Sequence, residues 1–390
     1  DNYSLIIKNG SYYIDGNLTN ADIALSGNKI KKIGKIELNS SNVIDATNKI
    51  VLPGIIDLHG DGFERHLNPR PSASFNMELG LRSAERELSS NGITTAYFAQ
   101  AYSWEGGYKS PSYAKDFFKA LYDYRKVCLT DIRAQVRYEI LMPEQINELI
   151  SIIKEFDISY FVYNNHIPVA QKIWKDYPDR IDGWAAKSGR TGSELITMVN
   201  QLAQKTDRLK PKLAELYSQL SLLNLSIGSH DDSTQEDRSY FNSIGATICE
   251  FPTSISTARY ARSIGNSIIM GAPNVVRGGS QSGSIPANDL IVEDLCDVLV
   301  SDYYYPSLSS AAWTLNDSGV VRFEKAWGFI SSGPAKALKL KLKGKLNHGY
   351  YADFIIMDPK QRSIEATFCK GRPTYMSGVL AERILKKIKN

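Results

Sequence analysis

The chain has 390 residues, a length that suits one barrel-sized domain together with a smaller one. Its apolar fraction of 43% and charged fraction of 23% are ordinary for a soluble globular protein, and a net charge of +4 is too small to indicate a nucleic acid or a membrane surface as partner. No apolar run reaches membrane-spanning length, and four cysteines without a CxxC pair indicate reduced thiols in a cytoplasmic protein.

The first fifty residues predict short strands joined by tight turns. Asn-Gly and Asp-Gly pairs favour the positive φ values that hairpin turns require. The predicted turns lie at Asn9-Gly10, Asp15-Gly16 and Ser26-Gly27. The same style returns near the other end of the chain, in residues 349–358 and 366–371. We therefore expect residues 1–52 and 341–390 to form one small β-sandwich domain built from both chain termini.

Residues 53–340 alternate predicted strands with helical stretches. Eight such units are typical of a (β/α)8 TIM-like barrel of the α/β class. The candidate strands are Ile55–His59, Ile93–Ala99, Ile132–Glu139, Tyr160–Asn164, Leu225–His230, Ala246–Phe251, Ile268–Gly271 and Val298–Asp302. Because the chemistry of this barrel lies at the carboxyl ends of its strands, the polar residues at those ends are the candidates for a functional site.

A long segment around residues 170–222 separates the fourth candidate strand from the fifth. Apolar residues recur in it at helical spacing, among them Leu195, Val199, Leu213 and Leu220. Such a helical insertion indicates a cap over the barrel mouth or a contact in a homo-oligomer. An amphipathic hairpin packed on the barrel wall is an equally good interpretation.

Three histidines and three carboxylates lie at the ends of predicted strands. They are His59, Asp61, Glu139, His166, His230 and Asp302. Each alone could be a satisfied core or loop residue, but their joint placement predicts a metal site. Imidazole and carboxylate donors suit divalent zinc, manganese or iron. Six groups are too many for one tetrahedral ion, so we expect two ions, with zinc favoured and Glu139 between them. Asp302 is also the candidate to accept a proton from the attacking water, as the catalytic residue.

Two loops next to these residues have the composition of a phosphate site. The first contains Arg277, Gly278, Gly279 and Ser280 after the seventh strand, where backbone N–H groups and a guanidinium would meet a phosphate. The second follows the first strand and contributes Arg70 and His66. His66 could instead hold the loop in place, and glycine-rich turns are common. The position of both loops beside the predicted metals favours a phosphorylated small molecule as substrate.

These motifs resemble the amidohydrolase superfamily, in residues 53–59 and 349–356. Within it, the chain is similar to the alpha-D-ribose 1-methylphosphonate 5-triphosphate diphosphatases of the carbon–phosphorus lyase pathway of phosphonate metabolism. The matching segments are 64–66, 69–71, 229–232, 270–282 and 301–304. The resemblance implies hydrolysis of a ribose 5-triphosphate to the 5-phosphate and pyrophosphate. By position it also implies His59, Asp61, Glu139, His166 and His230 as metal ligands and Asp302 as the catalytic carboxylate.

Two residues depart from the pattern of that family. Gln281 stands where the family has a histidine, and Asn165 stands where an aspartate precedes the histidine of the fourth strand. Both differences concern which triphosphate the protein would accept as its substrate. The alternative function is a metal-dependent N-acetyl-sugar deacetylase of the same superfamily, and a second alternative is a non-catalytic oligomeric scaffold. The set of predicted ligands argues against the scaffold.

Overall fold

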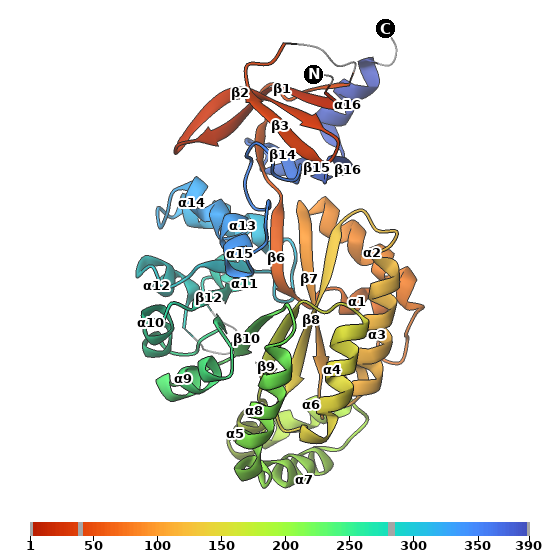
Figure 1. Ribbon diagram of the computed structural model, residues 1–390, viewed down its shortest axis with the longest axis vertical. Coiled ribbons are helices and arrows are strands. Elements are labelled where there is room, and N and C mark those ends of the chain that lie inside the picture. The colour runs from red at the N-terminus through yellow and green to blue at the C-terminus, as the bar shows by residue number, and fades with distance from the viewer. Residues whose placement is uncertain (1–2, 38–41, 280–284, 388–390) are drawn as a thin grey trace. The chain divides into compact units, whose positions relative to one another are not determined.

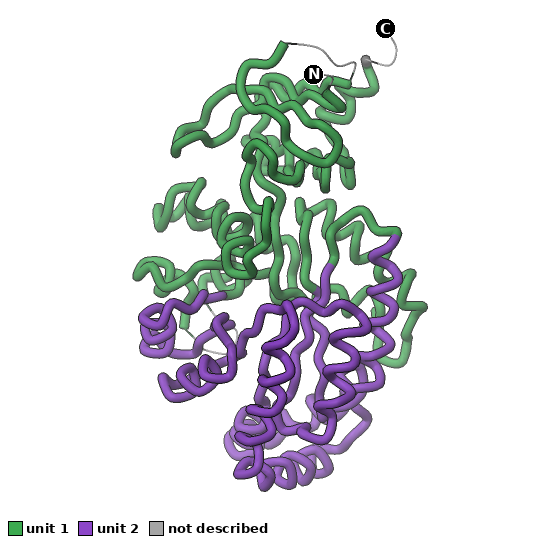
Figure 2. Tube along the Cα trace, viewed as in Figure 1, with its two compact units in different colours: residues 1–97, 127–132, 270–390 green, residues 98–126, 133–269 purple. Residues whose placement is uncertain are grey.

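The computed structural model describes residues 3–37, 42–279 and 285–387. The chain divides into two compact units (Figure 2). Unit 1 comprises Asp1–Tyr97, Val127–Ile132 and Met270–Asn390, and unit 2 comprises Phe98–Lys126 and Arg133–Ile269. The predicted domain boundaries near residues 52 and 341 remain a prediction.

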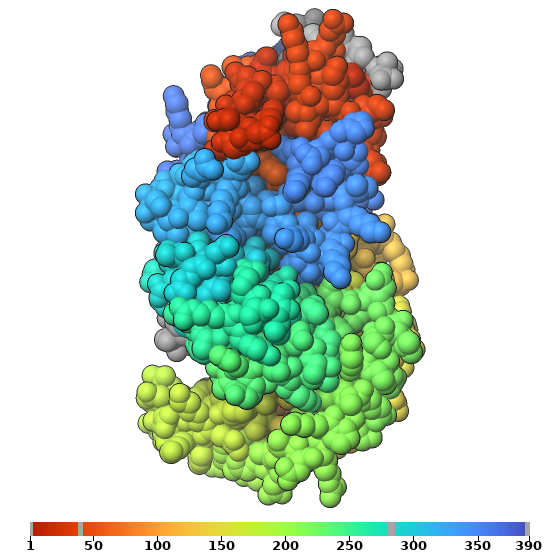
Figure 3. Space-filling view, turned by 60° about the vertical axis from the view of Figure 1, so that its left-hand side comes forward, coloured from red at the N-terminus to blue at the C-terminus, as the bar shows by residue number. Residues whose placement is uncertain are grey.

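The first sheet lies in unit 1 and is built from both ends of the chain (Figure 1). In the space-filling view, red atoms of the first strands and blue atoms near the other end of the chain lie next to each other (Figure 3). The order of this sheet is β16-β15-β14-β5-β1-β2-β3, with β4 beside β1. The strands are β1 (Leu5–Ile14), β2 (Asn17–Ser26), β3 (Lys29–Gly34), β4 (Val43–Asp45), β5 (Ile50–Pro53), β14 (Phe354–Asp358), β15 (Ser363–Cys369) and β16 (Arg372–Met376). Antiparallel pairing of β14 with β5 joins the two chain ends. The predicted small β domain from both termini is therefore confirmed, and its strands form one mixed sheet.

The prediction of a hairpin at Asn9-Gly10 is wrong. β1 runs continuously through both residues, and its pairing with β2 shifts register between Ile7 and Gly10. Asn9 has the expected positive φ of 62°, but it serves a bulge because β2 is a partner on both sides of it. A β-carbon on Gly10 would lie 2.9 Å from Val51 Cγ2, so glycine is required for close packing there. Asp15-Gly16, by contrast, forms the predicted two-residue turn between β1 and β2.

The second sheet has the order β13-β12-β11-β10-β9-β8-β7-β6. Its strands are β6 (Ile55–Gly60), β7 (Ile93–Tyr102), β8 (Asp131–Glu139), β9 (Tyr160–Asn164), β10 (Ser226–His230), β11 (Ile248–Glu250), β12 (Ser267–Gly271) and β13 (Val298–Val300). Each of the eight predicted barrel strands is present within a few residues of its predicted bounds. The sheet is parallel and nearly closed, because β13 returns to β6 through a bridge between Gly60 and Asp302 in unit 1.

Burial explains why the sequences of the barrel strands are largely continuous apolar runs and do not alternate between apolar and polar residues. All ten residues of β7 and all five of β9 are buried. Strands covered on both faces bury every side chain, as expected for a parallel sheet with helices outside and a packed interior. The residues of these two strands are therefore closed to solvent, whereas β8 has partly exposed side chains at Asp131, Arg133 and Arg137.

Helices connect the strands (Figure 1). They are α1 (Glu64–Leu67), α2 (Met77–Ser90), α3 (Pro111–Tyr124), α4 (Ile146–Glu155), α5 (Ile167–Asp176), α6 (Ile181–Ala186), α7 (Gly192–Ala203), α8 (Leu209–Leu220), α9 (Gln235–Ser243), α10 (Ile255–Ser263), α11 (Ala272–Arg277), α12 (Ala287–Val292), α13 (Ser307–Asp317), α14 (Phe323–Gly328), α15 (Ser332–Ala337) and α16 (Gly378–Lys387). The predicted insertion is helical and comprises α5 to α8. Across the described residues, no helix has the length and apolar character that crossing a bilayer demands.

Candidate functional site

The closing seam of the barrel in unit 1 brings three predicted site residues together. The Asp302 backbone N–H donates to the His59 carbonyl at 3.0 Å, and the Asp61 N–H donates to the Asp302 carbonyl at 2.7 Å. His59 is buried at the end of β6, whereas Asp61 and Asp302 are half-buried. Asp302 adopts a φ of 58°, a conformation that costs about 1 kcal/mol or more for most residues and that collects at functional sites.

Asp57, which the sequence analysis did not name as a site residue, links β6 to Ser301, the residue before Asp302. Its carboxylate accepts hydrogen bonds from the Ser301 backbone N–H at 3.0 Å and from the Ser301 hydroxyl. Burial raises the pKa of Asp57, although these hydrogen bonds act in the opposite direction. A β-carbon on Gly60 would lie 2.5 Å from the Ser301 hydroxyl oxygen, so glycine allows the two strands to approach here.

In unit 2, the structure brings Glu139 and His166 into direct contact. Glu139 ends β8, and His166 stands at the N-cap of α5, directly after β9. The His166 ring Nδ1 contacts Glu139 Oε1, and the His166 backbone N–H donates to Oε2 at 3.1 Å. Burial would lower the pKa of His166, but the carboxylates of Glu139 and Glu105 together outweigh burial and raise that pKa.

A second carboxylate, that of Glu105, lies next to this pair. One ligand atom from each of Glu105, Glu139 and His166 lies within 4.8 Å of the other two, and both carboxylates are buried. Two carboxylate oxygens and an imidazole nitrogen are donors that divalent zinc, manganese or iron accept, so the residues fit the divalent metal that the resemblance of the sequence implies. Glu105 was missed because it lies in a loop three residues beyond the end of β7.

His230 is paired with a second carboxylate that sequence reasoning missed. Its ring Nδ1 lies 3.1 Å from Glu250 Oε2, and Glu250 is fully buried at the end of β11. Glu250 also accepts hydrogen bonds from the Tyr160 hydroxyl at 2.6 Å and from the Gln135 amide at 2.9 Å. Metal-binding histidines commonly bond a carboxylate through one ring nitrogen, which orients the other nitrogen. The strand-end rule that found Glu139 could also have found Glu250.

The predicted phosphate loop after β12 is only partly available for binding. The Gly278 and Gly279 N–H groups already donate to carbonyls of α11, at 3.3 Å to Val275 and 3.0 Å to Asn274. They therefore end the helix instead of forming an open cradle. Arg277 is exposed, and its guanidinium lies 3.3 Å from the Tyr303 hydroxyl. Ser280 and Gln281 lie outside the described residues.

The second predicted phosphate loop holds His66 and Arg70. Both ring nitrogens of His66 have partners on α2: Nε2 contacts the Glu87 carboxylate and Nδ1 lies 2.9 Å from the Ser83 hydroxyl. These contacts suit the loop-holding role of His66. Arg70 is exposed next to a turn that it forms with Ala73. Asn165 is also exposed, and its side chain accepts a hydrogen bond from the Ile167 N–H at 3.2 Å.

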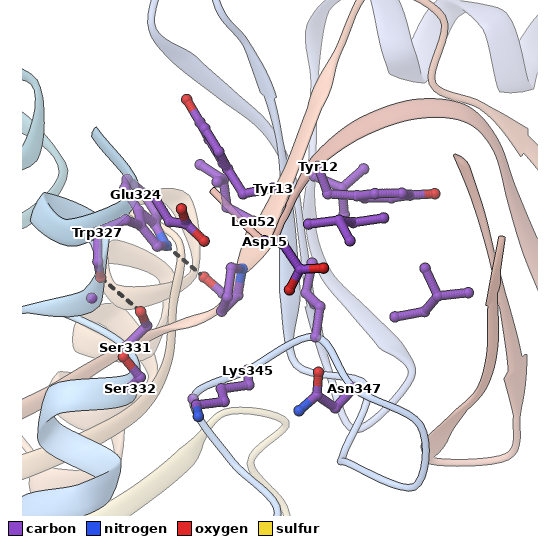
Figure 4. A pocket seen from close by; sticks show the side chains of 17 residues that line it. Tyr12, Tyr13, Asp15, Leu52, Glu324, Trp327, Ser331, Ser332, Lys345 and Asn347 are labelled. Carbon is purple, nitrogen blue, oxygen red and sulfur yellow. Dashed lines mark hydrogen bonds between the residues drawn. The ribbon is translucent and has the colours of Figure 1, made fainter. Parts of the chain in front are cut away.

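A cavity of about 610 Å³ lies elsewhere in unit 1 (Figure 4). β1 contributes Tyr13 to it, the turn after β1 contributes Asp15, and α14 contributes Trp327. The Trp327 indole donates to the Pro53 carbonyl at 3.0 Å. No predicted site residue lines this cavity, so it is distinct from the candidate metal centre.

The chain is similar along nearly its whole length to a known enzyme. It is 26% identical over 367 residues to the alpha-D-ribose 1-methylphosphonate 5-triphosphate diphosphatase of Escherichia coli K12, covering 92% of this chain and 97% of that protein. A dihydroorotase of Lactobacillus helveticus is 38% identical over 79 residues, which is 20% of this chain and 17% of that enzyme.

Solved structures with the same fold include enzymes of varied chemistry. The ochratoxinase of A. niger superposes with a TM-score of 0.66 at 12% identity, over 96% of each chain. The N-acetyl-D-glucosamine-6-phosphate deacetylase of Mycobacterium smegmatis gives a TM-score of 0.62 at 11% identity, over 96% of this chain and 100% of that one. These likenesses establish the TIM-like fold. A family model described as Amidohydrolase family matches residues 50–374. Because that match covers most of the chain, the protein belongs to the amidohydrolase family.

Proposed function

We propose that this amidohydrolase-family hydrolase cleaves alpha-D-ribose 1-methylphosphonate 5-triphosphate to the 5-phosphate and pyrophosphate. The observation that carries the proposal is the end-to-end similarity to the E. coli diphosphatase. The buried carboxylate and histidine cluster of unit 2 supports it, because such donors suit a metal-assisted hydrolysis.

In this proposal, His59, Asp61, Glu139, His166, His230 and Asp302 hold two divalent ions, with zinc favoured and manganese or iron as alternatives. The ions would lower the pKa of the attacking water and neutralise charge on the phosphoryl oxygens. The Glu250 carboxylate, 3.1 Å from Nδ1 of His230, would orient that ring. The exposed guanidinium of Arg277, together with Arg70, would bind the outer phosphates.

The chemical step requires one proton acceptor. As the oxygen of water bonds to the α-phosphorus, the phosphoanhydride bond between the α- and β-phosphoryl groups breaks, pyrophosphate leaves and the 5-phosphate remains. The water proton passes to the Asp302 carboxylate. Backbone hydrogen bonds with His59 and Asp61 hold Asp302 beside the end of β6, so that its side chain can accept the proton.

Replacing Asp302 with Asn tests this role. We expect turnover to fall by about 10²- to 10⁴-fold, since general base catalysis supplies acceleration of that order. Folding should be kept, because asparagine tolerates the positive φ of 58° at this position. Asp294→Asn is the matched control, because Asp294 also has a φ of 58° and is exposed outside the proposed site. Unchanged turnover in Asp302→Asn would overturn the assignment.

The substrate is tested by measuring which product is released. Purified protein loaded with zinc or manganese is offered sugar and nucleoside triphosphates together with N-acetyl-hexosamine 6-phosphates. We expect pyrophosphate from a ribose triphosphate. Acetate from the amino sugars would instead favour the deacetylase. If the purified protein binds neither zinc nor manganese and hydrolyses none of these compounds, the protein would be a non-catalytic scaffold.

A further inference from the structure

The loop that follows β7 contacts the helical insertion through both the carboxylate and the backbone of Glu105. The Trp184 indole N–H of α6 donates to Glu105 Oε1 at 2.7 Å. The Arg190 guanidinium, a few residues after α6, donates to the Glu105 backbone carbonyl at 2.6 Å. Glu105 itself is buried. The insertion is therefore more than a hairpin packed on the wall of the barrel, because it positions a buried acidic side chain.

Glu105 is held in the same way as Glu139, a predicted metal ligand. One oxygen of Glu105 accepts from the Trp184 indole, and one oxygen of Glu139 accepts from the Trp104 indole at 3.2 Å. The two indole rings lie 6.3 Å apart. An indole N–H donates a hydrogen bond but has no lone pair to offer a cation. Each carboxylate is thus oriented by a group that cannot compete with it for metal.

Two basic groups lie next to the buried carboxylates of this cluster. They are the His166 ring and the Lys109 ammonium, whose Nζ lies 3.2 Å from Glu105 Oε2 and whose side chain is 36% exposed. Ser103 donates to the same oxygen at 3.2 Å. A divalent ion would add positive charge between the two buried carboxylates and so favour their ionised forms. Ligand atoms bound to one ion at about 2.0–2.2 Å lie up to about 4.4 Å apart, so a cluster within 4.8 Å requires small adjustments to enclose an ion.

We propose that Glu105 is a further ligand of the divalent metal held by Glu139 and His166, and that Trp184 of the helical insertion is its positioning residue. The inference rests on the metal binding in the proposed function. It assigns a role to the segment that the sequence could describe only as a cap, an oligomer contact or a wall hairpin. Lys109, half-exposed on a flexible stem, would turn towards solvent when the metal binds.

A structural ion pair between Glu105 and Lys109 is the competing explanation, and metal titration separates the two. Protein stripped with a chelator is titrated with Zn²⁺ or Mn²⁺ by calorimetry, and bound metal is counted by elemental analysis. In Glu105→Gln we expect one bound equivalent to be lost or weakened by at least about 10-fold. Lys109→Met should bind metal at least as tightly as the unmodified protein. The control is Glu144→Gln, an exposed carboxylate paired with Lys205 at 3.0 Å outside the cluster.

The positioning role of Trp184 is tested by Trp184→Phe, which keeps an aromatic ring but removes the N–H donor. Loss of such an orienting hydrogen bond should weaken the same metal equivalent by about 10- to 100-fold. Trp174→Phe in α5 is the control, because Trp174 is 39% exposed. Quenching of tryptophan fluorescence by Co²⁺ gives a second readout that does not depend on activity, and it should decrease in Trp184→Phe but not in Trp174→Phe.

The outcomes distinguish this inference from the proposed function. If the unmodified protein binds no metal, the proposed function fails. If it binds metal and Glu105→Gln binds the same number of ions with the same affinity, the inference alone is overturned. Loss of stability in both Glu105→Gln and Lys109→Met, with metal binding unchanged in each, would identify a structural ion pair.

Discussion

At the scale of single residues, buried charges in this protein are held by paired partners. Lys343 in unit 1 is an example: its ammonium lies 2.8 Å from Asp353 and 3.1 Å from Asp131, and its side chain is 3% exposed. Burial would lower the pKa of Lys343, but the two carboxylates outweigh burial and raise it, which keeps the ammonium charged.

Replacing Lys343 with Met should therefore be strongly destabilising. The substitution leaves two buried carboxylates without their cation, a change that typically costs about 3–5 kcal/mol. Urea denaturation at pH 7 measures the free energy of unfolding. Lys345→Met, two residues further along in an exposed position, should change it by less than about 0.5 kcal/mol. Equal stabilities of the two variants would contradict the assigned role of Lys343.

At the scale of elements, the turn after β14 explains an expected sensitivity to acid. The Asp358 carboxylate accepts hydrogen bonds from the Gln361 N–H at 2.9 Å and the Lys360 N–H at 2.8 Å, and Lys49 lies 2.9 Å away. The Gln361 hydrogen bond, followed by that from Lys49, lowers the pKa of Asp358 to about 2.

The stabilisation from Asp358 should disappear on acidification. Because the folded-state pKa is depressed, this stability is present above the unfolded value of about 3.9 and is lost as the pH falls towards about 2. We expect Asp358→Asn to lower the melting temperature at pH 7, with a difference that narrows between pH 4 and pH 2. A difference that stays constant over this range would show that the charge of Asp358 does not matter.

At the scale of the whole molecule, metal binding should be visible as thermal stability. A ligand that binds only the native state stabilises it by about 2.7 kcal/mol at a concentration 100 times its dissociation constant. We therefore expect a chelator to lower the melting temperature and added zinc to restore it. Glu139→Gln should reduce this response, since Glu139 is a proposed ligand. A melting temperature that is indifferent to metal would count against the proposed site.

The sequence by itself predicted the barrel and the small β domain from both chain ends, because strand periodicity and turn pairs are local features. The family followed from the resemblance of its motifs to known ones. The sequence predicted the positive φ of Asn9 but not its use, since only the partner strand decides between a turn and a bulge. It also determined Glu139 and His166 as candidate ligands, since each directly ends or follows a strand.

Tertiary structure alone decided what surrounds those ligands. Glu105 lies in a loop and Trp184 lies 79 residues further along the chain, so no spacing rule connects them. In the folded chain, the N–H groups of Gly278 and Gly279 donate to the last carbonyls of α11, because the carbonyls at a helix end need hydrogen-bond donors. The physical reason is the same in each case. Hydrogen bonds between distant segments depend on how those segments pack, and the residues next to one another in the chain do not predict that packing.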